Sequence, residues 1–448
     1  MSKGNWAEAQ VSTIDGRVVL GADGMPLGFL GPDGLLPAVY GIGVPGRLGF
    51  GVGVCPEVLP NGMVGMYGYT DPTSENYGNY LTADGSVMVW IPAFYDLWGN
   101  GANGLPVNGV GIIGANGFAS EAAAAAAGYA LHRAFWDGGR RKSGFFIDKY
   151  QCSASPQGIA VSMKNEPPLS SSAAHNPFSI LNGSPATAHH GSFAAAKTRG
   201  PRFSVASRFQ FAALAELAYA HGAQSTNATF CAWYDAVNNW PKGNTNNALR
   251  DSADTSVIYA SDGYLNCGLT GSGVPFAKTT HNGQGCGVAD LNGNMWEICV
   301  GLTSNGTDYL VLRPSVAIAD LTSGSTLATD AWGASGRAAN YDNLGPSLGA
   351  LTASVTTKLF GNAAAVFGSG GSGAEWTARC LGIPLAGGVG GTNAFGNDGL
   401  YDSRPSDMCP ISGGSWLRGS NAGVWALDLS HSRSSSYDSV GFRAALYL

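Results

Sequence analysis

Residues 413–448 decide how this chain is interpreted, and they read GGSWLRGSNAGVWALDLSHSRSSSYDSVGFRAALYL. Glycines, tryptophans and leucines recur in this stretch, at places that suit tight turns and buried anchors. We call them the frame residues: Gly413, Gly414, Trp416, Gly419, Ala422, Gly423, Trp425, Leu427, Leu429, Arg433, Gly441, Phe442 and Arg443. The pattern predicts a rigid backbone whose anchors lie in the core.

Mostly short or polar residues lie between the frame residues, and they favour an exposed surface that contacts something. They are Leu417, Arg418, Asp428, Ser430, His431, Ser432, Ser435, Tyr437, Asp438 and Ser439. A second group of the same kind precedes them: Asp402, Ser403, Arg404, Ser406 and Asp407. We call both groups the candidate recognition residues and predict a ligand-binding region over about residues 393–448. The alternative is an ordinary solvated loop.

Composition limits the classes of function. The chain has 448 residues, of which 44% are hydrophobic, so it can bury a sizeable core. Only 12% are charged and the formal net charge is −6, so no basic surface for nucleic acid is expected. Its 67 glycines are roughly twice the usual share, which indicates many tight turns between short strands.

The first residues, MSKGNWAEAQ, are polar and no apolar segment follows them, so we expect no secretory signal. The longest aliphatic stretch, residues 122–127, is too short to span a bilayer, and no membrane insertion is predicted. We therefore expect synthesis as a soluble cytoplasmic protein. None of the eight cysteines forms a CxxC motif, and buried free thiols are expected.

The texture of the chain changes at residue 86. Residues 1–85 are glycine-rich and are expected to form a small, mostly β N-terminal region for attachment or oligomerisation. Residues 86–448 would form the second domain. Within it, the apolar stretches 86–99 and 145–153 each predict a core strand, and Ser120 begins a helix predicted to run through residues 122–136.

The clearest helix is predicted at SRFQFAALAELAYAHG, residues 207–222. Ser207 and Gln210 fit a capping box, and Gly222 fits a C-terminal stop. Two helices among many short strands and long loops predict an α+β fold.

The stretch ADLNGNMWEICVG, residues 289–301, is a second strong motif. Asp290, Asn292, Asn294 and Glu297 offer oxygen ligands around a turn glycine, which suits calcium, although the spacing is not that of an EF-hand. We treat a structural calcium ion as a hypothesis and expect no other cofactor. The alternative is that the asparagines adopt turn conformations while Trp296 anchors the core.

The order of these motifs resembles the formylglycine-generating-enzyme family, a variant of the C-type lectin fold. The similar segments are WIPAFYDLWG, FFIDKYQCS, RFSVASRFQFAALAELAYAHG, DLNGNMWEICVG, GGSW and GFR. The resemblance implies an α+β C-type lectin fold over residues 86–448. Enzymes of that family carry copper-binding cysteines just after the GGSW-like motif, whereas this chain has no cysteine after Cys409. Because Cu(I) needs soft thiolate ligands, we expect no enzyme activity and keep the oxidase only as an alternative.

The end of the chain resembles the variable proteins of diversity-generating retroelements, such as phage tropism determinants. Their C-terminal lectin-fold region holds residues recoded from adenine-containing codons, a set without Lys, Glu, Gln, Met or Trp. Every candidate recognition residue belongs to that set, and residues 376–448 contain no Lys, Glu or Gln.

The resemblance implies a phage tail receptor-binding protein in the virion, a homo-oligomer with a trimer favoured. Its partner would be a protein or glycan receptor on a bacterial surface. The alternative is a cellular variable protein in the bacterial cytoplasm or at the cell surface. Short polar residues on a rigid scaffold suit adaptable recognition, as in antibody paratopes.

Overall fold

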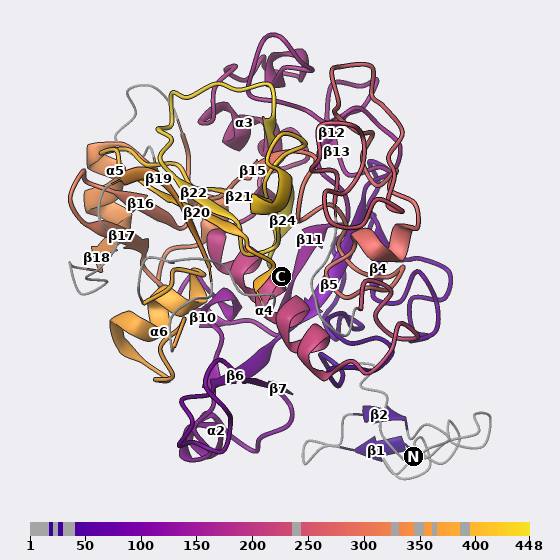
Figure 1. Cartoon of the computed structure of the whole chain (residues 1–448), viewed down its shortest axis with the longest axis vertical. Coiled ribbons are helices and arrows are strands. Elements are labelled where there is room, and N and C mark those ends of the chain that lie inside the picture. Colours follow the sequence, from indigo (N-terminus) through magenta and orange to yellow (C-terminus); the bar gives the residue numbers. More distant parts are fainter. Residues whose placement is uncertain are drawn as a thin grey trace.

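The protein is a mixed α+β structure with several sheets (Figure 1), as the sequence predicts. The computed structural model describes residues 18–20, 26–29, 41–234, 243–323, 331–344, 354–360, 365–385 and 395–448. Two six-stranded sheets organise this part of the chain, and smaller sheets and long loops surround them.

The first sheet is antiparallel, with strand order β14-β24-β11-β5-β4-β3. Its strands are β14 (Ser204–Val205), β24 (Ala444–Leu446), β11 (Gly144–Asp148), β5 (Val87–Pro92), β4 (Asn79–Leu81) and β3 (Val64–Gly65). β5 and β11 carry the aromatic and β-branched side chains that strands favour, and both are almost entirely buried.

The second sheet is mixed, with order β19-β20-β22-β21-β15-β23. Its strands are β19 (Ser354–Leu359), β20 (Gly399–Asp402), β22 (Leu427–Leu429), β21 (Ile411–Ser412), β15 (Trp296–Ile298) and β23 (Val440–Gly441). β22 and β23 come from the last stretch of sequence, whereas β24 of the same stretch belongs to the first sheet. The C-terminal segment therefore joins both sheets.

Smaller sheets lie around these two. One three-stranded sheet consists of β7 (Val110–Gly114), β6 (Phe94–Trp98) and β8 (Ala130–Leu131), and another of β16 (Leu302–Ser304), β17 (Tyr309–Leu312) and β18 (Tyr341–Asn343). The two-stranded sheets are β1 (Val18–Leu20) with β2 (Pro26–Phe29), β9 (Trp136–Asp137) with β10 (Arg140–Arg141), and β12 (Ser153–Ala154) with β13 (Ala160–Val161). The strand predicted over residues 86–99 is thus two strands, β5 and β6. The chain changes sheets at Ala93. Its N–H donates to the carbonyl of Ser143, and its carbonyl accepts from the N–H of Ala115.

The described residues include more helices than the two predicted: α2 (Glu121–Ala126), α3 (Gly191–Lys197), α4 (Arg208–Gln224), α5 (Ala334–Asn340) and α6 (Gly373–Cys380). Ser120 caps α2 as predicted, but the helix ends far earlier than residue 136. The cause is Gly128, whose φ of 83° lies in the left-handed region that terminates helices.

The predicted capping box of α4 is confirmed, because Ser207 and Gln210 bond each other's backbone N–H. The helix continues to Gln224, two residues beyond the predicted stop at Gly222. α4 lies in the middle of the molecule (Figure 1) and is buried on all sides along most of its length. It is therefore a central core helix and not an amphipathic surface helix.

Residues 41–85 are part of the same folded body as the rest. Strands β3 and β4 hydrogen-bond into the first sheet, and Ile42, Phe50 and Val52 are fully buried in the main core. The predicted domain boundary at residue 85 would cut this sheet, so the structure extends the main domain back to Gly41. An attachment or oligomerisation role for the N-terminal region stays a prediction.

A buried ion pair ties the two sheets together. Arg443, just before β24, binds Glu297 of β15 through two hydrogen bonds of 2.6 Å, and both side chains are almost fully buried. The same guanidinium donates to the carbonyls of Asp148 in β11 and of Ala289, at 3.0 and 2.9 Å. The Arg443 side chain thus bonds to elements of both six-stranded sheets.

We predict that Arg443→Ala destabilises the protein by about 3–5 kcal/mol, because it leaves the Glu297 carboxylate buried without its partner. Urea denaturation followed by tryptophan fluorescence measures the change. The matched control is Arg313→Ala, which removes a largely exposed pair with Asp342 and should cost about 0–1 kcal/mol. Equal losses in the two variants would contradict the role given to Arg443.

Candidate recognition face

Two loops that carry candidate recognition residues lie side by side. Residues 403–407 follow β20, and residues 430–439 follow β22. Backbone hydrogen bonds connect them: Arg404 N–H to Leu429 O at 3.2 Å, Cys409 N–H to His431 O at 2.8 Å, and Arg433 N–H to Asp407 O at 3.2 Å. The structure therefore brings together two groups that are separated by more than twenty residues in the sequence.

The third loop begins at Leu417 and reaches the same sheet. The Arg418 guanidinium lies 5.8 Å from the ring centre of Trp296 and 5.5 Å from that of Tyr401. Tyr401 of β20 is in register with Asp428 of β22, so their side chains leave the same face of the sheet. We call the surface formed by these three loops the candidate face.

The predicted frame is confirmed for most of its members. Trp416 is fully buried and Trp425 is 2% exposed, whereas Gly419, Ala422 and Arg433 are partly exposed. Two glycines are required by close approach. A Cβ on Gly414 would lie 2.4 Å from the Ala422 Cβ, and one on Gly423 would lie 1.9 Å from Asp398 Oδ1. The backbone under the candidate face therefore has no room for larger residues at these positions.

The candidate recognition residues differ in exposure. Ser406, Leu417, Arg418 and Tyr437 are exposed, with Leu417 at 53% and Tyr437 at 46%. The intermediate ones are Ser403, Arg404, Asp407, Ser430, His431, Ser432, Ser435 and Asp438. Asp402, Asp428 and Ser439 are buried, which corrects the expectation that all of these side chains lie at the surface.

Asp402 is buried because it holds a neighbour in place. Its Oδ1 accepts a 2.7 Å hydrogen bond from the Tyr309 hydroxyl, and both of its oxygens accept from Arg404 at 3.1 Å. The Arg404 guanidinium also lies 4.7 Å from the ring centre of Tyr309. Asp402 and Tyr309 together orient the half-buried Arg404 side chain at the candidate face.

Asp428 plays a similar supporting role for His431. Its Oδ1 accepts bonds from the Ser430 N–H and hydroxyl, at 2.9 and 2.5 Å, and its Oδ2 lies 3.3 Å from His431 Nε2. Burial by itself raises the pKa of the Asp428 carboxyl, but the bonds and charge of His431 and the bonds of Ser430 outweigh it. The pKa of Asp428 is therefore lowered below its usual range.

Three rings meet beside this pair. His431 and Tyr437 are in edge contact, with ring centres 4.8 Å apart, and His189 lies 5.6 Å from His431 and 6.1 Å from Tyr437. His189 is fully buried, and burial lowers its pKa well below the usual value. His189 supports the face from below, and no local sequence signal indicates this.

Three of the four residues of the calcium hypothesis are bound within the protein. Glu297 pairs with Arg443, Asp290 Oδ2 accepts from the Gly271 N–H at 2.7 Å, and Asn294 bonds both backbone polar groups of Gly268. Asn292 is buried, and its amide has no hydrogen-bond partner among the described residues. Of the two asparagines in the turn alternative, Asn294 has a left-handed φ of 67°, and Asp290, which was not part of that alternative, has a φ of 59°. Calcium at these residues stays a prediction.

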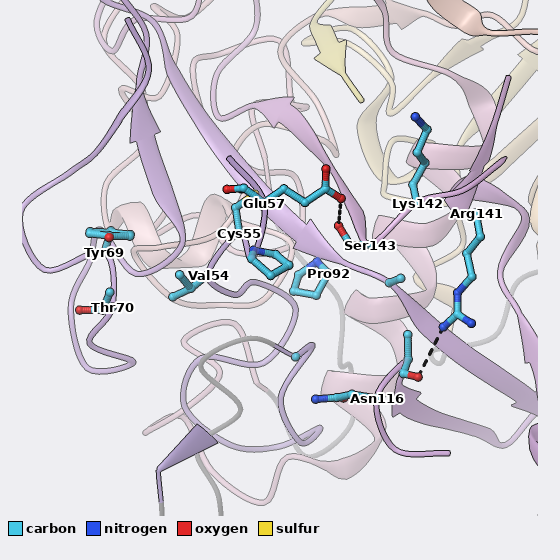
Figure 2. A pocket seen from close by; sticks show the side chains of 14 residues that line it. Val54, Cys55, Glu57, Tyr69, Thr70, Pro92, Asn116, Arg141, Lys142 and Ser143 are labelled. Atoms are coloured by element: carbon cyan, nitrogen blue, oxygen red, sulfur yellow. Dashed lines mark hydrogen bonds between the residues drawn. The ribbon is translucent and has the colours of Figure 1, made fainter. Parts of the chain in front are cut away.

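A separate cleft of about 760 Å³ lies away from the candidate recognition residues, none of which lines it. Figure 2 shows its wall of Val54, Glu57, Pro92, Arg141 and Ser143. The charged groups here have protein partners: the Ser143 hydroxyl donates to the Glu57 carboxylate, and Arg141 lies 3.3 Å from Glu121 Oε1. Sequence reasoning did not single out these residues.

All eight cysteines are buried and free, as predicted. Among the described residues, no helix is both long and apolar enough to cross a membrane.

Comparisons with known proteins add little. No protein-family model matches the sequence, and no curated protein matches it. Among solved structures, that of PvdO from Pseudomonas aeruginosa is similar at 11% sequence identity, over 82% of this chain and 95% of that chain, with a TM-score of 0.24. A TM-score this low indicates a distant likeness in structure and carries no information about function.

We predict a large loss of stability for one substitution and almost none for a substitution at the adjacent residue. Trp416→Ala should destabilise the protein by about 3–5 kcal/mol, because it removes a fully buried aromatic side chain. Leu417→Ala should change stability by less than about 0.5 kcal/mol, because that side chain is half exposed. Denaturant titration of both variants measures the difference, and a negligible loss for Trp416→Ala would show that the frame assignment is wrong.

The lowered pKa of Asp428 predicts a pH-dependent contribution to stability. A lowered carboxyl pKa stabilises the fold above the unfolded value of about 3.9, and this contribution disappears as pH falls through the folded pKa. Asp428→Asn should therefore lower the melting temperature at pH 6, and the difference from wild type should shrink below about pH 4. A difference that grows on acidification would contradict this role.

Proposed function

We propose that this protein is a ligand-binding protein that recognises its partner through the candidate face and catalyses no covalent step. One observation carries the proposal: exposed and half-exposed polar side chains from three loops lie on a frame whose tryptophans and glycines are buried and tightly packed. Such a scaffold holds the backbone while the surface side chains vary.

The chemistry of the exposed positions supports recognition. Leu417 and Tyr437 are among the large hydrophobic residues that remain exposed in the described structure, and the exposed Arg418 follows Leu417 in sequence. Tyrosine and arginine are enriched where protein surfaces bind partners, because each combines a large contact area with polar groups. Serines such as Ser406 add adaptable hydrogen bonds.

We further propose that the face is diversified by a retroelement on a C-type lectin fold of the formylglycine-generating-enzyme type. The support is the order of the sequence motifs and the restricted residue set of the recognition positions. The favoured setting is a phage tail protein that binds a protein or glycan receptor on a bacterial surface. Oligomerisation would strengthen weak single contacts through avidity.

The binding test uses the purified full chain, labelled with a fluorophore, on a panel of whole bacterial cells. Replacing Arg418 and Tyr437 together by Ala should reduce cell binding at least about tenfold on any strain that wild type binds, because exposed aromatic and Arg anchors dominate interfaces. The melting temperature should stay nearly unchanged, since both side chains are exposed.

The matched control is Tyr67→Ala, which removes a tyrosine that is 97% exposed and lies far from the candidate face in sequence. It should bind as wild type does. Equal loss in both variants, or unchanged binding by the double variant, would contradict the assignment of the face. The DNA beside the gene tests the retroelement part separately, because a near-copy of the 3′ coding end that differs at adenines is expected there.

A further inference from the structure

A cluster of three different metal-ligating side chains lies beneath the candidate face. It consists of His175, Asp262 and Cys267, whose ligand atoms all lie within 4.8 Å of one another. Asp262 and Cys267 belong to one loop, and the fold brings His175, which is 87 residues from Asp262, against them. Neither the calcium motif nor the candidate recognition residues include them.

The histidine is oriented as a metal ligand is. His175 Nδ1 lies 2.8 Å from the backbone carbonyl of Asp438, an acceptor, so this nitrogen carries the hydrogen. The other nitrogen, Nε2, lies 2.7 Å from Asp262 Oδ2, and a hydrogen is shared between these two atoms. A hydrogen bond from the second ring nitrogen to a backbone carbonyl is the usual support of a metal-bound histidine.

Neighbouring aromatic rings fix this geometry further. The ring of Tyr264 stacks on His175 with centres 4.3 Å apart at 11°, and the Tyr264 hydroxyl donates to Asp438 Oδ2 at 2.8 Å. The ring centre of Trp416, a frame residue, lies 6.0 Å from the imidazole centre, with the two rings nearly perpendicular. The cluster is therefore already ordered by its surroundings.

The thiol of Cys267 has no role as a nucleophile in this arrangement. It is fully buried, and both nitrogens of His175 are bound to other groups. The Asp262 carboxylate, which lies within 4.8 Å of the thiol, would favour a cation beside it.

We propose that His175, Asp262 and Cys267 supply three ligands of a site for a transition-metal ion, with zinc as the ion that fits best. Imidazole, carboxylate and thiolate are the three ligand types that zinc takes in proteins, whereas calcium and magnesium require oxygen. The proposal is independent of the proposed function, because it concerns what holds the loops beneath the candidate face.

The protons and charges balance on binding. Zinc replaces the thiol hydrogen of Cys267 and the hydrogen shared between His175 Nε2 and Asp262, and both leave as protons. Two positive charges enter and two leave, so the net charge of the site is unchanged. The His175 and Asp262 ligand atoms, now 2.7 Å apart, would separate to about 3.3 Å, as zinc bonds of about 2.0–2.1 Å in tetrahedral geometry require.

The site would stabilise the loop of residues 430–439. The His175 ring hydrogen-bonds to the backbone carbonyl of Asp438, and the Tyr264 hydroxyl donates to the Asp438 carboxylate. The experiment uses the full chain produced in zinc-supplemented medium. Elemental mass spectrometry measures how much zinc is bound per chain. We expect about one zinc per chain, and zinc removed by a chelator should lower the melting temperature. Replacing zinc with Co(II) should give a thiolate-to-metal absorption band.

Cys267→Ser should abolish that band, and the matched control Cys55→Ser, at another buried free cysteine, should keep it. Asp262→Asn, which preserves side-chain shape, should weaken zinc binding at least about tenfold and covers the case in which the cysteine variant fails to fold. Wild-type protein without stoichiometric metal and without the cobalt band would overturn the proposal, as would a band that survives in Cys267→Ser. These outcomes do not depend on cell binding.

Discussion

The buried pair of Arg443 and Glu297 is the interaction on which the rest of the structure depends. It connects the last sequence motif, GFR, to the DLNGNMWE motif through two 2.6 Å bonds and joins the two six-stranded sheets. A buried pair of this kind contributes little net stability over apolar residues, but either partner alone is strongly destabilising. The pair therefore specifies where the C-terminal segment must lie.

This constraint explains how an exposed surface is combined with a rigid backbone. β22 and β23 are strands of one sheet and β24 is a strand of the other, so both ends of the 430–439 loop are fixed. Trp416 and Trp425 fill the core below, and Gly414 and Gly423 allow close backbone approach. Leu417, Arg418 and Tyr437 then project from a backbone that their replacement need not disturb.

Much of this could be predicted from the sequence, because the signals are local. The capping box of Ser207 and Gln210, the strand at residues 145–148 and the burial of Trp416 each follow from neighbouring residues. The α+β class follows from the mixture of such segments. The buried frame could be distinguished from the exposed positions because glycine suits tight turns and tryptophan suits buried anchors, whereas the residues between them are mostly polar.

What the sequence did not predict depends mostly on distant partners. Asp402 looks like a surface residue, but the distant Tyr309 bonds it in the core. Asp428 is the exception, because its partners Ser430 and His431 are near neighbours in the sequence. His189 becomes a core residue only because the chain folds it against His431 and Tyr437. Asp262 and Cys267 share one loop, but His175 joins them only through the fold, since it is 87 residues from Asp262 in the sequence. A boundary at residue 85 would cut the first sheet, because β3 pairs with β4 and β4 pairs with β5.

The measurement that tests the central claim most directly is tolerance to substitution. Two libraries of the displayed full chain, one randomised at Ser406, Leu417, Arg418 and Tyr437 and one at Gly414, Trp416, Gly423 and Trp425, are selected for resistance to protease. A rigid frame under a variable surface predicts that most members of the first library survive and few of the second do. Equal survival in the two libraries would contradict it.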